Sequence, residues 1–554
     1  MKTFCLTLFF TAYLTFSAVC DQPNAGVPPK NLSFLSHGIN LNDWFTPWAK
    51  PDTYWDAFHP EEADFLKHAG FTVCRLPLAP DLLFDSNNPG SLSPNLRYVD
   101  HAVRLLLNAG LAVILDPIHG SSSDATWERR MAHDPSFLTK VEIYWQALAR
   151  HFAKFSSDRI FFEVMNEPHL TAIEKIDPSW WAAVQQKLVV AIRKGAPFNT
   201  IIATGEKWGG IDGLVELKPL PERNIVYSFH WYEPFTFTHQ GAVWTGPIQA
   251  ELHNVPYPSS PDAVASLAES LADSRARQRV LKYGKERWNI KRIRAGLARA
   301  AMWGQSNKVP IFCGEFGAYR KDSNEKDRVK WLSDVRQVLE SLGIGWAMWD
   351  YETDFGLVTF SEPFWRRGPH VDKDYLQALG LDTRPTLTFT SGDPTLSDFV
   401  TGRIRTLTLP AQYWSRLWTR EAGTGKSHVI FNTQWDVTGL ILKIRTTQDW
   451  ALPSGVRIPV VTGEKLRLLS TTSLTGPGSL RLEFVARDKT GRVVNWSFDS
   501  VKVTQGTSHN IETGVAVVPP GVATLEPRWS GQLSIDATVS NLKLEHLVNG
   551  SSGG

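Results

Sequence analysis

Short apolar segments alternate with amphipathic segments over residues 31–382, and this alternation limits the possible folds more than any other feature of the sequence. The apolar segments predict strands at 37–41, 72–78, 112–118, 160–167, 200–205, 225–232, 310–316 and 345–350. Helices are expected between them at 61–69, 98–109, 137–152, 180–194, 291–303 and 330–342. Eight strands with intervening helices over about 350 residues predict an α/β fold, a (β/α)₈ TIM barrel.

The pattern changes after residue 382. Residues 383–394 are rich in Thr, Ser and Pro and predict a short linker. From 395 to 548 we expect strands at 428–432, 440–446, 465–470, 479–486, 493–498, 524–529 and 532–544, with no helical pattern between them. This part predicts a smaller all-β domain, a sandwich or jelly roll.

Residues 1–20 have the form of a secretory signal peptide. A lysine at position 2 precedes an apolar stretch, and small residues follow at Ser17 and Ala18. A membrane anchor needs roughly twenty apolar residues, and this stretch is shorter. We therefore expect a protein that is secreted, extracellular or periplasmic, with no membrane association after cleavage.

Charge and cysteine content exclude other classes. Lys+Arg 58 against Asp+Glu 56 leaves a net charge of +2, without the basic field that nucleic-acid binding requires. We expect no nucleic-acid partner and a monomer. Cys74 and Cys313 lie in predicted strands, so we expect two buried free thiols, and their side-chain parity predicts that they face different layers.

Two predicted strands end in glutamates. The segment Phe161–Glu167 is apolar until its last residues, and Pro168 stops strand pairing directly after Glu167. The segment from Val309 to Gly317 has the same design, with Glu315 between glycines that let other groups approach closely. A carboxylate at the end of a buried strand is costly to ionise unless function requires it. The pair predicts acid/base and nucleophilic chemistry on one bond.

Other polar or aromatic residues follow the same strand ends. They are Arg75, His119, Asn166, His230, Tyr232 and Trp349. His230 and Tyr232 are two residues apart, so both face the mouth of the barrel. Asn166 and Glu167 are adjacent, and both reach the mouth only if the strand twists or bulges at its end.

Taken together, these residues resemble the functional set of glycoside hydrolase family 5, the cellulase family, over residues 31 to 381. The resemblance implies that Glu167 is the general acid/base and Glu315 the nucleophile. It implies that Asn166 bonds the sugar 2-hydroxyl, Tyr232 steadies the nucleophile and Trp349 forms the floor under the reacting sugar. Arg75 favours the charged form of Glu315, and a negative neighbour favours the protonated form of Glu167.

Structural roles remain as alternatives for individual residues. A lone histidine such as His119 is more often structural than catalytic, and Arg75 has the alternative of pairing with a core carboxylate. Glu163 has the same parity as Glu167, and we interpret it as a polar group of the barrel interior without a catalytic role. The histidines lack short metal-ligand spacing, so we expect no metal and no cofactor.

The 22 tryptophans have two explanations, sugar stacking and core packing. Candidates for sugar stacking in the barrel are Trp208, Trp231 and Trp244, with Trp44 and Trp48 from the first loop. In the C-terminal domain they are Trp414, Trp418, Trp435, Trp450, Trp496 and Trp529. That domain either binds glucan or supports the barrel as a docked partner, and the short linker favours docking.

The sequence thus predicts a glycosidase with a polysaccharide partner, a secreted retaining β-glucan hydrolase and specifically an endo-1,4-β-glucanase. The alternatives are a β-mannanase or β-1,3-glucanase with the same chemistry. A carbohydrate-binding protein without activity is a third interpretation, which the presence of both glutamates disfavours.

Overall fold

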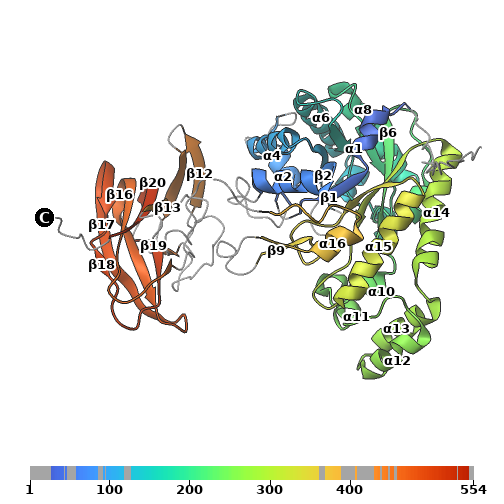
Figure 1. The fold of residues 1–554 in the computed structure, drawn as a ribbon. Helices are drawn as coiled ribbons and strands as arrows, with labels where there is room; N and C mark the ends of the chain where they lie inside the picture. The colour runs from blue at the N-terminus through green and yellow to red at the C-terminus, as the bar shows by residue number, and fades with distance from the viewer. Residues whose placement is uncertain are drawn as a thin grey trace, which may run out of the picture.

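The computed structural model describes residues 26–42, 44–46, 58–84, 91–93, 95–117, 126–360, 369–387, 406–408, 430–436, 439–446, 450–453, 458–532 and 535–547. These residues form a closed barrel of eight parallel strands surrounded by helices, and a separate antiparallel all-β part (Figure 1). The predicted fold class is therefore confirmed.

The barrel strands follow one another in chain order. They are β1 His37–Asn40, β2 Val73–Leu78, β3 Ala112–Pro117, β4 Ile160–Glu163, β5 Ile201–Thr204, β6 Ile225–Trp231, β7 Ile311–Phe316 and β8 Gly345–Met348. Ile39 of β1 is in register with Cys74 of β2 on one side and with Met348 of β8 on the other, which closes the ring. All eight strands were expected, but β4 ends at Glu163 and β8 at Met348, earlier than predicted.

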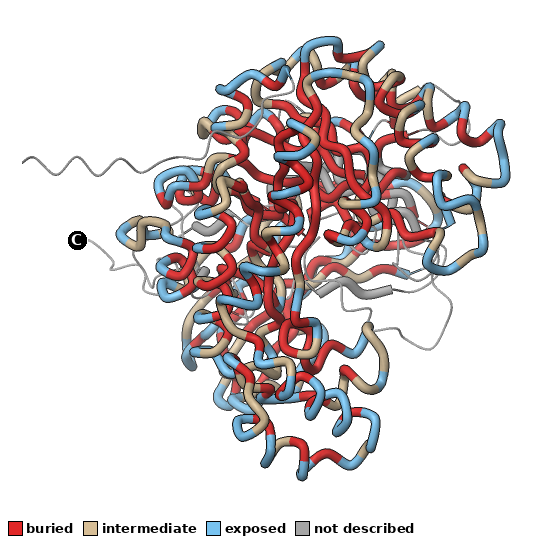
Figure 2. Tube along the Cα trace, turned by 90° about the vertical axis from the view of Figure 1, so that its right-hand side faces the viewer, coloured by how far each residue is buried: buried red, intermediate tan, exposed pale blue. Residues whose placement is uncertain are grey.

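Helices connect the strands on the outside of the barrel. They are α1 Pro29–Phe34, α2 Pro60–Ala69, α3 Pro80–Leu83, α4 Leu96–Asn108, α5 Thr126–His133, α6 Pro135–Phe152, α7 Leu170–Ile173, α8 Trp180–Gly195, α9 Ile211–Glu216, α10 Phe235–Thr238, η2 Val243–Thr245, α11 Pro247–Ala250, α12 Pro261–Ser270, α13 Ser274–Glu286, α14 Ile290–Asn307, α15 Glu325–Ser341 and α16 Lys373–Ala378. In the longer helices apolar residues recur at helical spacing, as at Leu96, Val99, Val103 and Leu106 of α4, which are all buried. Figure 2 shows stretches of buried and exposed residues alternating along the outer helices, around an interior that is mostly buried.

The barrel interior is apolar near the N-terminal ends of the strands and polar near their C-terminal ends. The apolar cluster includes Val73, Ala112, Ile114, Phe161, Ile202, Val226, Phe312 and Ala347. Side chains alternate between the two faces of a strand, so moving two residues along from Val73, Ile114 and Phe161 gives Arg75, Asp116 and Glu163. The apolar layer thus supports a polar layer directly beneath the barrel mouth.

A β-bulge in β7 changes which face of the strand its side chains point to. Phe229 is in register with Cys313 and His230 with Glu315, so Gly314 is an extra residue on β7. The bulge turns Glu315 to the inner face and leaves Cys313 in the outer core, together with Cys74. Both cysteines are free and buried as predicted, but the prediction that they face different layers is wrong, because parity does not continue through a bulge.

Two short strands, β9 Val358–Phe360 and β10 Pro369–Val371, follow the barrel and pair only with each other. The C-terminal strands form one ten-stranded antiparallel sheet. The sheet strands are β11 Thr406–Thr408, β12 Ile430–Asp436, β13 Gly439–Thr446, β14 Trp450–Pro453, β15 Ile458–Pro459, β16 Lys465–Arg487, β17 Val493–Glu512, β18 Ala516–Val517, β19 Thr524–Gln532 and β20 Ile535–His546. Residues 465–470 and 479–486, expected as two strands, belong to the single long strand β16.

β16 exchanges partners halfway along its length. Residues 466–475 pair with β20, and residues 479–487 pair with β19. The exchange coincides with Gly476, which has a φ of +102°, and with the Pro477 that follows it. Partner exchange at a bend is how one strand serves both layers of a sandwich. Leu468, Leu482, Phe484, Leu525 and Trp529 belong to a core made only of residues from this part of the chain.

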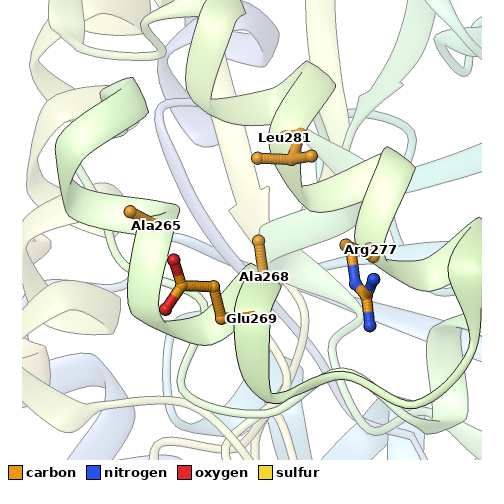
Figure 3. A pocket seen from close by; sticks show the side chains of 5 residues that line it. All are labelled: Ala265, Ala268, Glu269, Arg277 and Leu281. Atoms are coloured by element: carbon orange, nitrogen blue, oxygen red, sulfur yellow. The ribbon is translucent and has the colours of Figure 1, made fainter.

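Between β6 and β7 the chain inserts a pair of helices, α12 and α13. A shallow hollow of about 380 Å³ lies on this pair, lined by Ala265, Ala268, Glu269, Arg277 and Leu281 (Figure 3). It offers a single carboxylate and is not formed by the strand ends, so we do not regard it as the site of chemistry. Among the described residues, no helix is both long and apolar enough to span a bilayer.

Candidate active site

The C-terminal ends of β2, β4, β6, β7 and β8 bring predicted residues together. Arg75 lies on β2, His230 on β6 and Glu315 on β7, while Asn166 and Glu167 lie just beyond β4. Trp349 follows β8 directly. His119 falls outside the described residues, so its predicted role stays a prediction.

Glu315 is held by hydrogen bonds to both carboxylate oxygens. Arg75 Nη1 donates to Oε1 at 2.8 Å, and Tyr232 Oη donates to Oε2 at 2.7 Å. Burial raises the pKa of Glu315 above its ordinary value of 4.5, although His230 and Arg75 act in the opposite direction. These contacts fix the direction of the carboxylate.

Two glycines make this packing possible. A Cβ atom at Gly314 would lie 2.6 Å from Ser228 Oγ, and one at Gly317 would lie 2.2 Å from the backbone oxygen of Trp349. Neither position has room for a side chain, because β7 lies against β6 on one side and the end of β8 on the other. The expected role of the glycines beside Glu315 is confirmed.

Glu167 lies beyond the end of β4, and its carboxylate is close to that of Glu315. The strand ends at Glu163, and Glu167 has a φ of +41°, so the backbone is no longer extended at Glu167. This change of direction was expected, because two adjacent residues of a regular strand, Asn166 and Glu167, cannot both face the mouth. Its Oε1 lies 2.8 Å from His230 Nδ1. A carboxylate oxygen of Glu167, one of Glu315 and a ring nitrogen of His230 all lie within 4.8 Å of one another.

His230 links the two glutamates. Its Nδ1 lies 2.8 Å from Glu167 and 3.6 Å from Glu315. Burial lowers the pKa of His230, but Glu315 and Glu167 outweigh burial, so the net shift is upward from 6.5. The two carboxyl groups thus favour the protonated form of the imidazole.

These three side chains are also close enough to bind a metal ion. However, the ring nitrogen that faces the carboxylates already bonds Glu167, and each oxygen of Glu315 accepts a hydrogen bond from Arg75 or Tyr232. A metal ion would have to displace these contacts. Hydrogen bonding accounts for the cluster without a metal.

The aromatic candidates divide into exposed and buried residues. Trp208 and Trp244 have exposed fractions of 42% and 59%, whereas Trp44 is 2% exposed. The prediction that Trp44 stacks on sugar is wrong, because its ring packs against Phe45 and Phe58 in the core. Trp231 is likewise buried in the core and is not a stacking residue, and Trp48 lies outside the described residues.

Both exposed rings rest on aromatic supports. Trp208 stacks on His169 with a centroid distance of 5.0 Å and an interplanar angle of 17°. Trp244 packs edge-on against Tyr319 at 5.1 Å. Each ring is thus fixed in orientation while one surface stays accessible to a ligand.

Partly buried Trp349 and Tyr232 pack against a cluster of Ala242, Tyr319 and Phe355 near the centre of the site.

Two residues at the site, Asn40 and Asp116, were not expected, and Glu163 was expected only as a polar group of the barrel interior. Asn40 donates to the backbone oxygens of Gly314 and Met348 and accepts from Arg75, so it joins β1 to its neighbours. Asp116 and Glu163 lie beside Arg75 in the polar layer. Their position two residues beyond an inward-facing apolar residue was the available sequence signal.

In the C-terminal part, Trp529 is 1% exposed and belongs to the core, so the prediction that it binds sugar is wrong. Trp496 is exposed and lies between Arg487 and Arg528, whose guanidinium carbons are 6.0 and 5.5 Å from its ring centroid. Trp414 and Trp418 lie outside the described residues, as do the side chains of Trp435 and Trp450.

Known proteins share the barrel. Endoglucanase 3 of Fibrobacter succinogenes is 26% identical over 345 residues, which covers 59% of this chain and 51% of that protein. Endoglucanase C of Acetivibrio thermocellus is 27% identical over 320 residues, covering 57% and 90%. The chain thus spans about half the length of the first of these relatives and most of the second.

Solved structures agree. A hyperthermophilic endo-β-1,4-glucanase in complex with substrate superimposes with a TM-score of 0.50 and 26% identity, covering 63% of this chain and 98% of that one. Cel5A of Thermotoga maritima in complex with cellobiose gives a TM-score of 0.50 and 26% identity, covering 64% and 99%. The family model described as cellulase, glycosyl hydrolase family 5, matches residues 32–354. The chain belongs to this family, and the protein is a glycosidase.

Proposed function

We propose that this protein is a retaining endo-1,4-β-glucanase, with Glu315 as nucleophile and Glu167 as general acid/base. The observation that carries the proposal is the approach of the two carboxylates to within 4.8 Å. Retaining glycosidases have carboxyl groups about 5–5.5 Å apart, whereas inverting enzymes need roughly 6.5–9.5 Å to admit a water molecule.

In the first step, Glu315 attacks the anomeric carbon and the glycosidic C–O bond breaks. Glu167 gives its proton to the leaving oxygen, so the departing sugar leaves as a neutral alcohol. Arg75 and Tyr232 hold the two oxygens of Glu315, which presents one orientation to the sugar. The product of this step is a glycosyl ester on Glu315.

In the second step, water attacks the same carbon and the ester bond breaks. Glu167, now ionised, takes a proton from the water, and Glu315 returns to its carboxylate form. His230 supports both stages, because its bond to Glu167 persists while the proton on that residue is lost and regained. Two displacements at one carbon leave the product in the β-configuration.

Substrate binding is assigned to aromatic residues around the carboxylates. Trp349 is the proposed floor beneath the reacting sugar, and Asn166 the partner of its 2-hydroxyl. Trp208 and Trp244 are the proposed platforms for sugars further along the chain, since both are exposed and supported from behind. The similarity to proteins named endoglucanases favours β-1,4-glucan as substrate.

We also propose that the protein is secreted through residues 1–20 and acts as a monomer without a cofactor. The signal-like sequence supports export.

Product analysis on three soluble polymers tests the proposal. Carboxymethyl cellulose, β-mannan and a β-1,3-glucan are incubated with the wild type and with Glu315→Gln as matched control. The proposal expects a rapid fall in viscosity and short oligosaccharides from the cellulose derivative, absent in the control. Faster cleavage of β-mannan or β-1,3-glucan would reassign the substrate, and no cleavage of any polymer would contradict an endo-acting hydrolase.

A further inference from the structure

The guanidinium of Arg75 has all five of its N–H groups engaged. Nε and Nη2 donate to the two oxygens of Glu163 at 2.8 and 2.9 Å. Nη1 donates to Asn40 at 3.0 Å and to Glu315 at 2.8 Å, and the second Nη2 hydrogen goes to Asn166 at 2.8 Å. A guanidinium has no further hydrogen to give.

Asp116 receives no hydrogen bond from the residues that the structure describes. Its Oδ2 lies 2.9 Å from Arg75 Nη2, yet neither of its oxygens has a hydrogen-bond partner among those residues, and its side chain is fully buried. One positive charge therefore faces three buried carboxyl groups: those of Asp116, Glu163 and Glu315. A buried carboxylate that receives no hydrogen bond and faces two others is not stable in its charged form.

We propose that Glu163 is a positioning residue for Glu315, acting through Arg75, and that Asp116 beside it is held as a neutral acid. The inference rests on the proposed role of Glu315 as nucleophile. Glu163 accepts hydrogen bonds from two nitrogens of Arg75, and this fixes the guanidinium so that Nη1 donates to Glu315. Asp116 carries the proton that the crowded cluster must retain, which leaves the positive charge of Arg75 to Glu163 and Glu315.

Electrostatics supports this division. Burial raises the pKa of Asp116 well above its ordinary value, and the charges of Glu163, Glu315 and Glu167 raise it further against the opposing effect of Arg75. Glu163, in contrast, accepts two hydrogen bonds from the guanidinium of Arg75. The two carboxyl groups occupy the same layer but differ in the hydrogen bonds that they receive.

The pH dependence follows from the charges that surround Glu315. The titratable groups there are Arg75 on β2, Asp116 on β3, Glu163 on β4, Glu167 after β4, His230 on β6, Tyr232 after β6 and Asp350 after β8. Removing the negative charge of Glu163 leaves more of the positive charge of Arg75 for Glu315. The pKa of Glu315 then falls, and the acid limb of kcat/KM moves to lower pH.

The test compares pH profiles of kcat/KM on a soluble glucan. Asp116→Asn fixes that group as neutral, and its acid limb should coincide with that of the wild type. Adding Glu163→Gln to this variant should move the limb down by about one pH unit. It should also lower kcat roughly 10- to 100-fold with KM nearly unchanged, the size of effect found for groups that orient functional side chains from behind.

Two further variants separate charge from position. Glu163→Asp keeps the charge but retracts it by one methylene, so kcat should fall while the acid limb stays in place. Glu62→Gln is the control for loss of a buried carboxylate, because Glu62 bonds Tyr351 and the His59 backbone and does not contact Arg75. It should move neither the limb nor kcat.

Infrared difference spectra supply a measurement that does not need turnover. The wild type minus Asp116→Asn at neutral pH should show the carbonyl stretch of a protonated carboxyl group. A lost carboxylate band instead, or a shifted acid limb in Asp116→Asn, would overturn the neutral assignment. Full activity in Glu163→Asp, or an equal loss at every pH in the double variant, would overturn the positioning role. Neither result touches the assignment of Glu315, which its own variants test.

Discussion

The floor and the rim of the barrel mouth are built in opposite ways. The floor, defined as Arg75, Asp116, Glu163 and Glu315, is almost completely buried and every N–H of its one cation is used. The rim, defined as Trp208 and Trp244, consists of half-exposed rings with one supported side each. The floor depends on mutual contacts among charges, while each rim residue depends only on its own support.

The contrast separates two kinds of function. Members of a coupled charge cluster act as a unit, so removal of one member should cost far more than a single contact. Independent platforms contribute one sugar contact each, so their losses should be small and should affect binding. We therefore expect the floor to set the rate and the rim to set affinity for the polymer.

The largest effect should come from the proposed nucleophile. Glu315→Ala should fold and bind sugar but hydrolyse it roughly 10⁴-fold more slowly, the scale expected for loss of a member of a catalytic unit. Steady-state kinetics with a melting curve measure both properties. Azide should restore activity with retained configuration to Glu167→Ala and not to Glu315→Ala. Near wild-type turnover of Glu315→Ala would contradict the claim that the floor sets the rate.

Arg75→Lys should have the next largest effect. Lysine keeps the charge but lacks the planar fork that serves Glu163, Glu315 and Asn166 at once. We expect kcat to fall by roughly 10²-fold or more, comparable to deletion of one electrostatic donor in an active site. A loss confined to KM would mean that Arg75 serves binding and belongs with the rim.

Trp208→Ala and Trp244→Ala should act on binding. Each should raise KM on polymeric glucan roughly tenfold, the equivalent of one aromatic contact of about 1.4 kcal/mol, with kcat within a few-fold of wild type. A short aryl glycoside should respond much less, because it does not reach a distant platform. Additive losses in the double variant would confirm that the two platforms are independent.

The smallest effect on soluble substrate should come from the C-terminal part. Trp496→Ala should leave turnover of soluble glucan unchanged, and reduced adsorption to insoluble cellulose would identify Trp496 as a binding residue. A chain ending at Asp382 tests docking. A lowered melting temperature or aggregation is expected if the β part supports the barrel. Unchanged melting temperature and unchanged kinetics would indicate an independent module.

The sequence was sufficient for the barrel and for most of its strand-end residues, because apolar periodicity and chain order determine which residues reach the mouth. It was insufficient where a local irregularity changed parity. Gly314 adds one residue to β7, and no periodicity rule indicates on which face Glu315 then lies. Trp44 and Trp208 look alike in sequence, since burial depends on residues distant along the chain.

The interpretation of Glu163 also needed the structure. Its parity placed it correctly in the barrel interior, but only three-dimensional contacts reveal that it occupies two nitrogens of Arg75 and leaves Asp116 without a donor among the described residues. These partners come from different strands, and their competition for five hydrogens is invisible in a linear sequence.

The stereochemistry of the first product tests the central claim most directly. Proton NMR of the wild-type reaction, recorded before mutarotation, distinguishes the anomer released from a soluble β-1,4-glucan. Two carboxylates within 4.8 Å predict the β-anomer, through a glycosyl ester on Glu315. An initial α-anomer would contradict the retaining mechanism and the assignment of Glu315 as nucleophile.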